Sequence, residues 1–200
     1  MLHDFGGDLH HLVDLDLLPE SPVVVDAGAC IGDFVLAMLD VRPKARIFAI
    51  EPSHRNLMKL RSVADSLPMV DVIEAALVGV SGDIMLTDPI GANDRYYQWA
   101  SVHHDRASQA FSRNDFMSAE MYKVRGVSLW DLTGGSYIDY LKMDIEGSEC
   151  EVFEAGLNPA QIGQISFEVH TKNGYASKLL RMGFSGIEIR GSEIYARGES

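Results

Sequence analysis

Short apolar runs rich in β-branched residues alternate along this chain with stretches whose apolar residues recur every three or four positions. Such an alternation is typical of βαβ units, in which helices pack on both faces of a largely parallel sheet. The predicted strands cover residues 22–27, 45–51, 70–78, 138–145 and 164–170. The predicted helices cover residues 33–41, 54–66, 148–155 and 175–182. The sequence therefore predicts a doubly wound, mostly parallel α/β fold.

The end of the chain departs from this alternation. Two apolar runs, 184–190 and 192–197, flank Gly191 and predict an antiparallel hairpin. The 200 residues suffice for one compact core, since a chain of this size buries roughly 70% of its unfolded surface. We therefore expect one domain over residues 1–200.

Residues 82–130 interrupt the alternation and form a predicted insertion in this domain. Within it, 89–117 have little clear periodicity, apart from some helical character around 107–111. Trp99 and His103 lie in this part and are candidate substrate contacts. Long irregular segments in compact domains are often functional or disordered. The insertion is thus either a substrate lid or a segment without a function of its own, and the sequence leaves both open.

Composition narrows the range of partners. Seventeen basic side chains against 29 acidic ones give a net charge of −12, which disfavours binding to nucleic-acid phosphates. No apolar run reaches the roughly 18 residues needed to span a bilayer, and the first residues do not resemble a signal peptide. Cys30 and Cys150 lack the spacing of a disulfide framework or a zinc site. We expect a cytoplasmic protein without nucleic-acid or membrane partners; its oligomeric state is not predicted.

The segment 23–32, VVVDAGACIG, reads as a buried strand that runs into a glycine turn and then a helix. Gly28 and Gly32 allow a tight turn and the close approach of a ligand, with a purely structural turn as the alternative role of Gly28. Cys30 replaces the middle glycine of a dinucleotide fingerprint. Asp26 would repel a phosphate but suits a cationic amino-acid group. The pattern therefore favours a nucleotide-like ligand that carries such a group.

Glu51 ends the second predicted strand, about 20 residues after the glycine turn, where an acidic side chain can accept hydrogen bonds from both hydroxyls of a ribose. Taken alone, Glu51 could as well be a solvated carboxylate at a strand end. Because it occurs together with the glycine turn, we interpret it as a ribose-binding residue.

The segment 141–149, LKMDIEGSE, resembles the signature of the FkbM family of methyltransferases. Residues 26–32, 51–53, 75–79 and 127–132 resemble further segments of that family. The resemblance implies a Rossmann-like class I methyltransferase fold, with S-adenosylmethionine as the cofactor. The cofactor-binding residues that it implies are Asp26, Gly28, Ala29, Cys30, Gly32, Glu51, Pro52, Ala75, Ala76 and Asp144. The sequence departs from the family at Cys30, where a polar residue such as Asn is more usual, and in its short segment before the first strand.

Alternate side chains of a strand share a face, so Lys142, Asp144 and Glu146 are expected to project together, as are Glu168 and His170. Both sets lie near the carboxyl ends of strands, where a doubly wound sheet binds its ligands. Ionisable groups are costly to bury without partners, so we expect a paired network. The transferred methyl group is expected to point at this network.

His170 is the candidate general base, because the unperturbed pKa of histidine lies near neutrality; a structural or substrate-binding role is the alternative. Asp144 is expected to bind substrate or to assist as base, unless it only pairs with Lys142. We assign Lys142 to the catalytic residues, as the cation that holds these carboxylates in place. Glu168 and Glu146 are candidate substrate contacts, and Glu146 could instead be a helix-start charge.

No metal is predicted, although Asp144, Glu168 and His170 remain an alternative ligand set without tight metal spacing. The predicted function is O-methylation of a hydroxyl on a sugar or small natural product. The acceptor is thus a small molecule or glycan, or a peptide if the enzyme methylates an amide nitrogen. A noncatalytic nucleotide-binding or interaction protein is a further alternative, and a dehydrogenase is disfavoured by Asp26 and Cys30.

Overall fold

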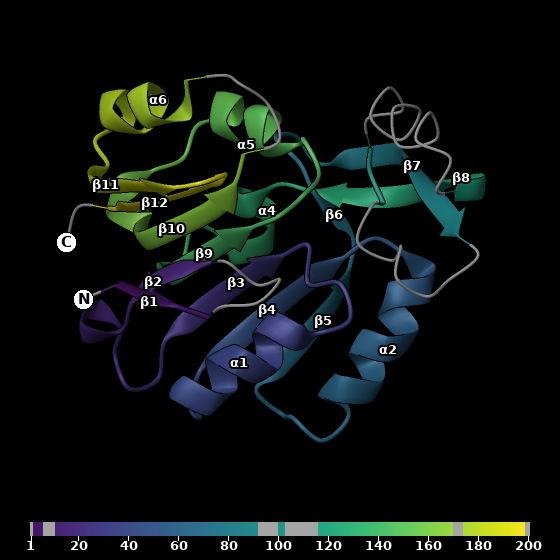
Figure 1. The fold of residues 1–200 in the computed structure, drawn as a ribbon, viewed down its shortest axis with the longest axis horizontal. Coiled ribbons are helices and arrows are strands. Elements are labelled where there is room, and N and C mark those ends of the chain that lie inside the picture. Colours follow the sequence, from purple (N-terminus) through teal and green to yellow (C-terminus); the bar gives the residue numbers. More distant parts are fainter. Residues whose placement is uncertain (1, 6–10, 92–99, 103–115, 170–173, 199–200) are drawn as a thin grey trace.

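The computed structural model describes residues 2–5, 11–91, 100–102, 116–169 and 174–198, and its centre is a seven-stranded sheet (Figure 1). The strands lie in the order β11-β12-β10-β9-β3-β4-β5. Their bounds are β3 (Val23–Ala27), β4 (Arg46–Glu51), β5 (Val70–Glu74), β9 (Ile138–Met143), β10 (Ile162–Glu168), β11 (Ser185–Arg190) and β12 (Glu193–Arg197). The first five of these run parallel, and β12 pairs antiparallel with β10 and β11. The predicted mostly parallel sheet with a C-terminal antiparallel hairpin is confirmed.

Helices cover both faces of this sheet, as a doubly wound fold requires (Figure 1). They are α1 (Asp33–Val41), α2 (His54–Ala64), α4 (Leu129–Thr133), α5 (Glu149–Ala155) and α6 (Tyr175–Met182), with short 3-10 turns at η2 (Leu15–Leu17) and η4 (Pro159–Gln161). Phe34 of α1 and Leu60 of α2 share a buried cluster with Tyr140 of β9. On the opposite face, Phe153 of α5 and Leu179 of α6 belong to the second buried cluster. None of the described helices is long and apolar enough to cross a bilayer.

The direction in which strands are added to the sheet reverses between β3 and β9. The chain passes from β3 to β4 and β5 on one side, and later adds β9 and β10 on the other. At such a switch point the connections leave in opposite directions and open a crevice beyond the carboxyl ends of the two strands. Asp26 of β3 and Lys142 of β9 are register partners beside this crevice.

The N-terminal segment packs across the sheet, which the sequence did not predict. Strands β1 (Leu2–Asp4) and β2 (Leu12–Asp14) form a small antiparallel pair. Leu12 is completely buried; its N–H donates to Ser166 Oγ at 3.0 Å, and its carbonyl accepts from Tyr140 Oη at 3.1 Å. These bonds satisfy the backbone N–H and carbonyl of Leu12 with side chains from β10 and β9. The segment therefore covers the sheet without forming a further strand in it.

The predicted strand 70–78 is wrong as one continuous element. Strand β5 ends at Glu74, and β6 (Ala76–Leu77) belongs to a different, three-stranded sheet. Between them the Ala75 N–H donates to the Ile73 carbonyl at 3.0 Å, a three-residue turn that redirects the chain. Both halves are apolar enough to read as one strand, which is why periodicity alone missed the break. The bounds of the other predicted elements agree with the structure to within two residues.

The two ends of the predicted insertion pair with each other as a long antiparallel hairpin. Strands β7 (Gly82–Gly91) and β8 (Phe116–Val127) pair with each other, and β6 joins β8 (Figure 1). The strand residues at both ends of 89–117 correct the expectation of an irregular segment there. Leu86 and Val124 are buried while Met85 is exposed, the alternation of a sheet with one covered face. The predicted helix at 107–111 lies outside the described residues, and the lid function stays a prediction.

Candidate active site

The glycine turn after β3 is held in a strained, closely packed conformation. Gly28 has φ +76°, and a Cβ at this position would lie 1.9 Å from the Asp144 carbonyl oxygen, so the approach of the loop after β9 excludes a side chain. Cys30 adopts φ +52°, which costs a non-glycine residue on the order of 1–3 kcal/mol. Its N–H donates to Glu51 Oε2 at 2.8 Å. The backbone at the position of the missing middle glycine is therefore held by the strand-end carboxylate.

Glu51 is buried at the end of β4 and is surrounded by neutral donors. Its Oε1 accepts from Ser53 N at 2.9 Å and from Asn56 Nδ2 at 3.2 Å. Burial raises the pKa of the Glu51 carboxyl to about 7, although the N–H donors of Ser53 and Cys30, the Asn56 amide and the charge of Lys142 act in the opposite direction. Glu51 thus changes its charge near neutral pH, close to the end of the glycine turn.

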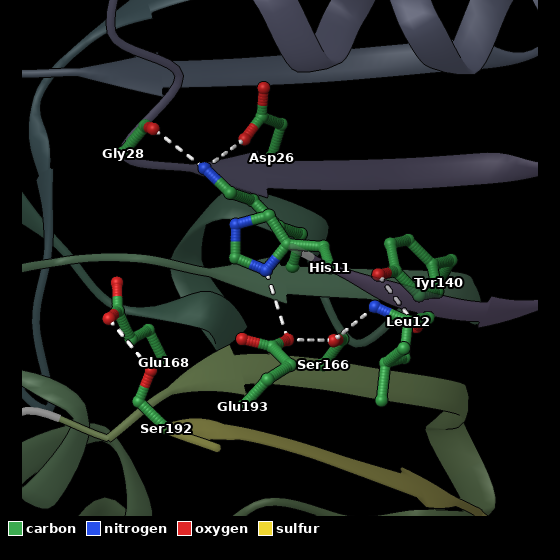
Figure 2. A network of polar contacts seen from close by, with 10 residues as sticks. His11, Leu12, Asp26, Gly28, Tyr140, Ser166, Glu168, Ser192 and Glu193 are labelled. Atoms are coloured by element: carbon green, nitrogen blue, oxygen red, sulfur yellow. Dashed lines mark hydrogen bonds and ion pairs between the residues drawn. The ribbon is translucent and has the colours of Figure 1, made fainter. Parts of the chain in front are cut away.

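Asp26 is also buried, but a cation accompanies it. Lys142 Nζ lies 3.0 Å from Asp26 Oδ1 and donates to the Gly28 carbonyl at 2.8 Å (Figure 2). Burial lowers the pKa of Lys142, yet the charges of Asp26 and Asp144 outweigh this effect and leave it above its usual value. Asp26 Oδ2 is inaccessible and has no hydrogen-bond partner among the described residues. The pair therefore retains one unmet acceptor oxygen, which is the oxygen of Asp26 without a dashed line in Figure 2.

The loop after β9 carries the remaining residues of the LKMDIEGSE segment. Asp144 is half-buried, and its N–H donates to the Ala27 carbonyl at 3.0 Å, which extends the pairing of β9 with β3. Glu146 has φ +50°, and its carbonyl accepts from Ser101 Oγ at 2.9 Å. The Gly147 N–H donates to Glu149 Oε1 at 3.3 Å. Glu149 begins α5 and interacts with this turn, whereas Glu146 lies before the helix.

The predicted residues of the fifth strand are only partly described. Glu168 ends β10, and its Oε1 accepts from Ser192 Oγ at 3.0 Å (Figure 2). His170, the candidate base, and the candidate contacts Trp99 and His103 lie outside the described residues. Within the described part of the chain, no three His, Cys, Asp or Glu side chains are grouped so that they could hold a metal ion. The roles of His170, Trp99 and His103 stay predictions.

The structure contains a buried polar network beside Lys142 that the sequence did not predict. His11 Nδ1 lies 3.0 Å from Glu193 Oε1, and the same oxygen accepts from Ser166 Oγ (Figure 2). Ser166 and Lys142 are register partners on adjacent strands, so the network borders the site. The signal was present, because Ser166 and Glu193 are polar residues inside apolar strands. Their partner His11 could not be assigned, since it precedes the first predicted strand.

The remaining predicted cofactor residues line the edges of this arrangement. Ala29, Ala75 and Ala76 are buried alanines, and Pro52 is half-buried beside Glu51. Gly32 has φ +97° and immediately precedes α1. These residues offer small side chains and backbone atoms rather than charged groups. Among the predicted cofactor residues, the side chains that can carry a charge at this site are therefore mainly the carboxylates Asp26, Glu51 and Asp144.

The mostly parallel sheet, the helices on both of its faces and the glycine turn after β3 together define a Rossmann-like class I methyltransferase fold for this chain. Its fold is similar to that of the solved methyltransferase FkbM from Methylobacillus flagellatus KT, with a TM-score of 0.59 and 16% identity over 91% of this chain and 45% of that one. It is also similar to precorrin-6y C5,15-methyltransferase from Geobacter metallireducens GS-15, with a TM-score of 0.50 and 14% identity, over 90% of this chain and 79% of that one.

The family model of the methyltransferase FkbM domain matches residues 26–190, so the chain belongs to the FkbM methyltransferase family. It is 28% identical over 165 residues to methyltransferase sdnD of Sordaria araneosa, covering 72% of this chain and 64% of the relative. It is 25% identical over 140 residues to 2-O-methyltransferase NoeI of Sinorhizobium fredii (strain NBRC 101917 / NGR234), covering 68% and 58%. The chain thus spans about three fifths of the length of these two relatives.

Proposed function

We propose that this protein is an S-adenosylmethionine-dependent O-methyltransferase that acts on a hydroxyl of a sugar or small natural product. The observation that carries this proposal is the pair of buried carboxylates, Asp26 and Glu51, on either side of the strained glycine turn. A dinucleotide site would place a pyrophosphate at this turn, where the Asp26 carboxylate opposes it. A ligand with a cationic amino acid and a ribose matches both carboxylates.

The residues present fit S-adenosylmethionine. Asp26 Oδ2, which has no hydrogen-bond partner among the described residues, would accept from the ammonium group of the amino-acid end once its buried side chain becomes accessible to the ligand. Glu51 stands at the end of β4, where a carboxylate can accept from both ribose hydroxyls. When bound, this cofactor supplies an activated methyl group on a positively charged sulfur. The small side chains of Ala29, Ala75 and Ala76 are compatible with close approach of the remaining parts of the ligand.

The chain's own residues would orient the acceptor and remove its proton. Lys142 holds Asp26 in place through the 3.0 Å ion pair and fixes the turn through the Gly28 carbonyl. Asp144, half-buried just after β9, would bind the acceptor hydroxyl or accept its proton, with His170 as the other candidate base. Positioning the hydroxyl in line with the methyl group would lower the barrier to transfer.

A hydroxyl acceptor is supported by the printed name of the relative NoeI, a 2-O-methyltransferase. The test is calorimetry with S-adenosylmethionine, its demethylated product S-adenosylhomocysteine, NAD and NADP, followed by a methyl-transfer screen of sugars, small natural products and peptides. We expect binding of the first two ligands and transfer to a hydroxyl. Binding of NAD alone would contradict the proposal, and transfer only to a peptide amide would replace O-methylation by N-methylation.

Transfer itself is tested with Asp144→Asn, which preserves the size of the side chain. We expect single-turnover methylation of the acceptor to fall by about 10² to 10⁴, the usual range for the loss of general acid or base help. A rate within threefold of wild type would show that Asp144 neither carries the proton nor positions the acceptor.

A further inference from the structure

A buried carboxylate in the hairpin, Asp88 of β7, meets the beginning of α2. Its side chain is 4% exposed, and its Oδ2 accepts from Ser53 Oγ and from Tyr122 Oη, both at 2.8 Å. Its Oδ1 pairs with Arg55 Nη2. A buried charge is costly unless donors of this kind satisfy it. The position of Asp88 is therefore specified by groups from two other elements, α2 and β8.

Ser53 connects this carboxylate to Glu51. As the N-cap of α2, Ser53 accepts from the Asn56 N–H through Oγ, and the same Oγ donates to Asp88. Its own N–H donates to Glu51 Oε1 at 2.9 Å, and Asn56 Nδ2 donates to that oxygen at 3.2 Å. Both donors that hold Oε1 of Glu51 thus belong to the helix start that Asp88 fixes.

Tyr122 gives the same junction a second support. Its hydroxyl donates to Asp88 and accepts from the His54 N–H at 3.2 Å. The Tyr122 ring stacks on the His54 ring, with centroids 4.4 Å apart. The negative charge of Asp88 also lies at the N-terminal end of α2, where the helix dipole favours an anion. The hairpin and the first turn of α2 consequently form one packed unit next to the site.

We propose that Asp88 is a positioning residue for cofactor binding, which holds Glu51 in its binding geometry through Ser53. The proposal rests on the proposed function, because the ligand of Glu51 is the cofactor ribose. Asp88 lies 37 positions after Glu51, within the segment that the sequence marks as an insertion. The hairpin therefore supports the cofactor side of the site.

Thr87, the residue before Asp88 in β7, is linked through Ser101 to the loop after β9. Thr87 and Ser101 exchange backbone hydrogen bonds at 2.9 and 3.0 Å, and Ser101 Oγ donates to the Glu146 carbonyl. Ser101→Ala removes this bond without touching Asp88 or Ser53. We expect it to leave the affinity for S-adenosylhomocysteine unchanged, which makes it a control for general loosening of the hairpin.

The experiment measures the affinity of the full chain for S-adenosylhomocysteine by calorimetry, together with urea unfolding. Asp88→Asn removes the charge that receives three donors, and we expect the dissociation constant to rise about tenfold, as for the loss of roughly one charge-assisted hydrogen bond. The matched control is Asp83→Asn on the same strand, whose exposed pair with Lys123 includes no residue of α2. We expect this control to bind like wild type.

If Asp88→Asn does not fold, Tyr122→Phe provides the test, because this substitution deletes only one hydroxyl. We expect it to weaken binding about threefold. With methyl transfer as readout, Asp88→Asn should raise the KM for the cofactor and leave the KM for the acceptor unchanged. Affinity within twofold of wild type in folded Asp88→Asn, or in Tyr122→Phe, would overturn the inference while wild-type binding upholds the proposed function. Absence of binding by wild type would overturn both.

Discussion

The two sides of the candidate site are built differently. On the β3–β4 side, the groups that hold Glu51 come from nearby in the sequence, with Cys30 the most distant at 21 positions. On the β9–β10 side, Glu146 is contacted by Ser101 from the hairpin, and the bordering network joins His11 to Glu193, 182 positions away. The direct contacts of Glu51 thus form a local motif, which Asp88 of the hairpin supports through Ser53, whereas the direct contacts of the second side join segments far apart in the sequence.

The charges follow the same division. Asp26, at the boundary, takes its cation Lys142 from β9, whereas Glu51 has neutral N–H donors around it and a pKa of about 7. Two carboxylates at the ends of adjacent strands thus differ in what compensates their burial. The proposed cofactor site therefore combines one ion-paired carboxylate with one carboxylate whose pKa lies near neutrality.

Removal of the cation is expected to have the largest effect. Lys142→Met leaves Asp26 buried without its partner, and breaking such a pair costs about 3–5 kcal/mol of unfolding free energy. The control is Lys44→Met, because Lys44 and Glu20 form an exposed pair, and exposed pairs contribute about 0–1 kcal/mol. Urea unfolding at pH 7 measures both variants. A loss no larger than that of the control would show that Asp26 does not depend on Lys142.

The titration of Glu51 is expected to have an intermediate effect. Since burial raises its pKa to about 7 from an ordinary value of 4.5, the folded protein keeps a proton that the unfolded chain releases. The stabilising contribution is complete below pH 4.5 and is lost as the pH rises through 7. Glu51→Gln resembles the protonated side chain but does not titrate. Between pH 5.5 and 8, wild type should therefore lose about 2 kcal/mol relative to this variant.

Denaturant unfolding of both proteins across this pH range gives the comparison. A difference in unfolding free energy that stays constant from pH 5.5 to 8 would contradict the titration of Glu51 near neutrality.

The same division explains what the sequence could predict. The strand, the glycine turn and Glu51 follow from local periodicity and spacing, and the structure places them together at the end of β3 and β4. The pairing of Lys142 was expected, but the expected partners were carboxylates of β9 and β10. Strand register instead aligns Lys142 with Asp26, which no pattern within β9 reveals. Likewise Asp88 reads as one polar residue in an insertion, because its partners on α2 become neighbours only through the fold.

The most direct test of this account is calorimetry of S-adenosylhomocysteine with two variants, one from each side of the site. Glu51→Ala should weaken binding at least tenfold, since ribose hydrogen bonds to a charged group contribute roughly 1.5 to 3 kcal/mol each. Asp144→Asn preserves the size of the side chain and should bind within twofold of wild type, because we assign Asp144 to the acceptor although the family resemblance also counts it among the cofactor residues. Glu74→Ala is the control, because Glu74 is the register partner of Glu51 at the end of β5 and is exposed. Unchanged affinity in Glu51→Ala, or an equal loss in Asp144→Asn, would contradict the separation of a cofactor side from an acceptor side.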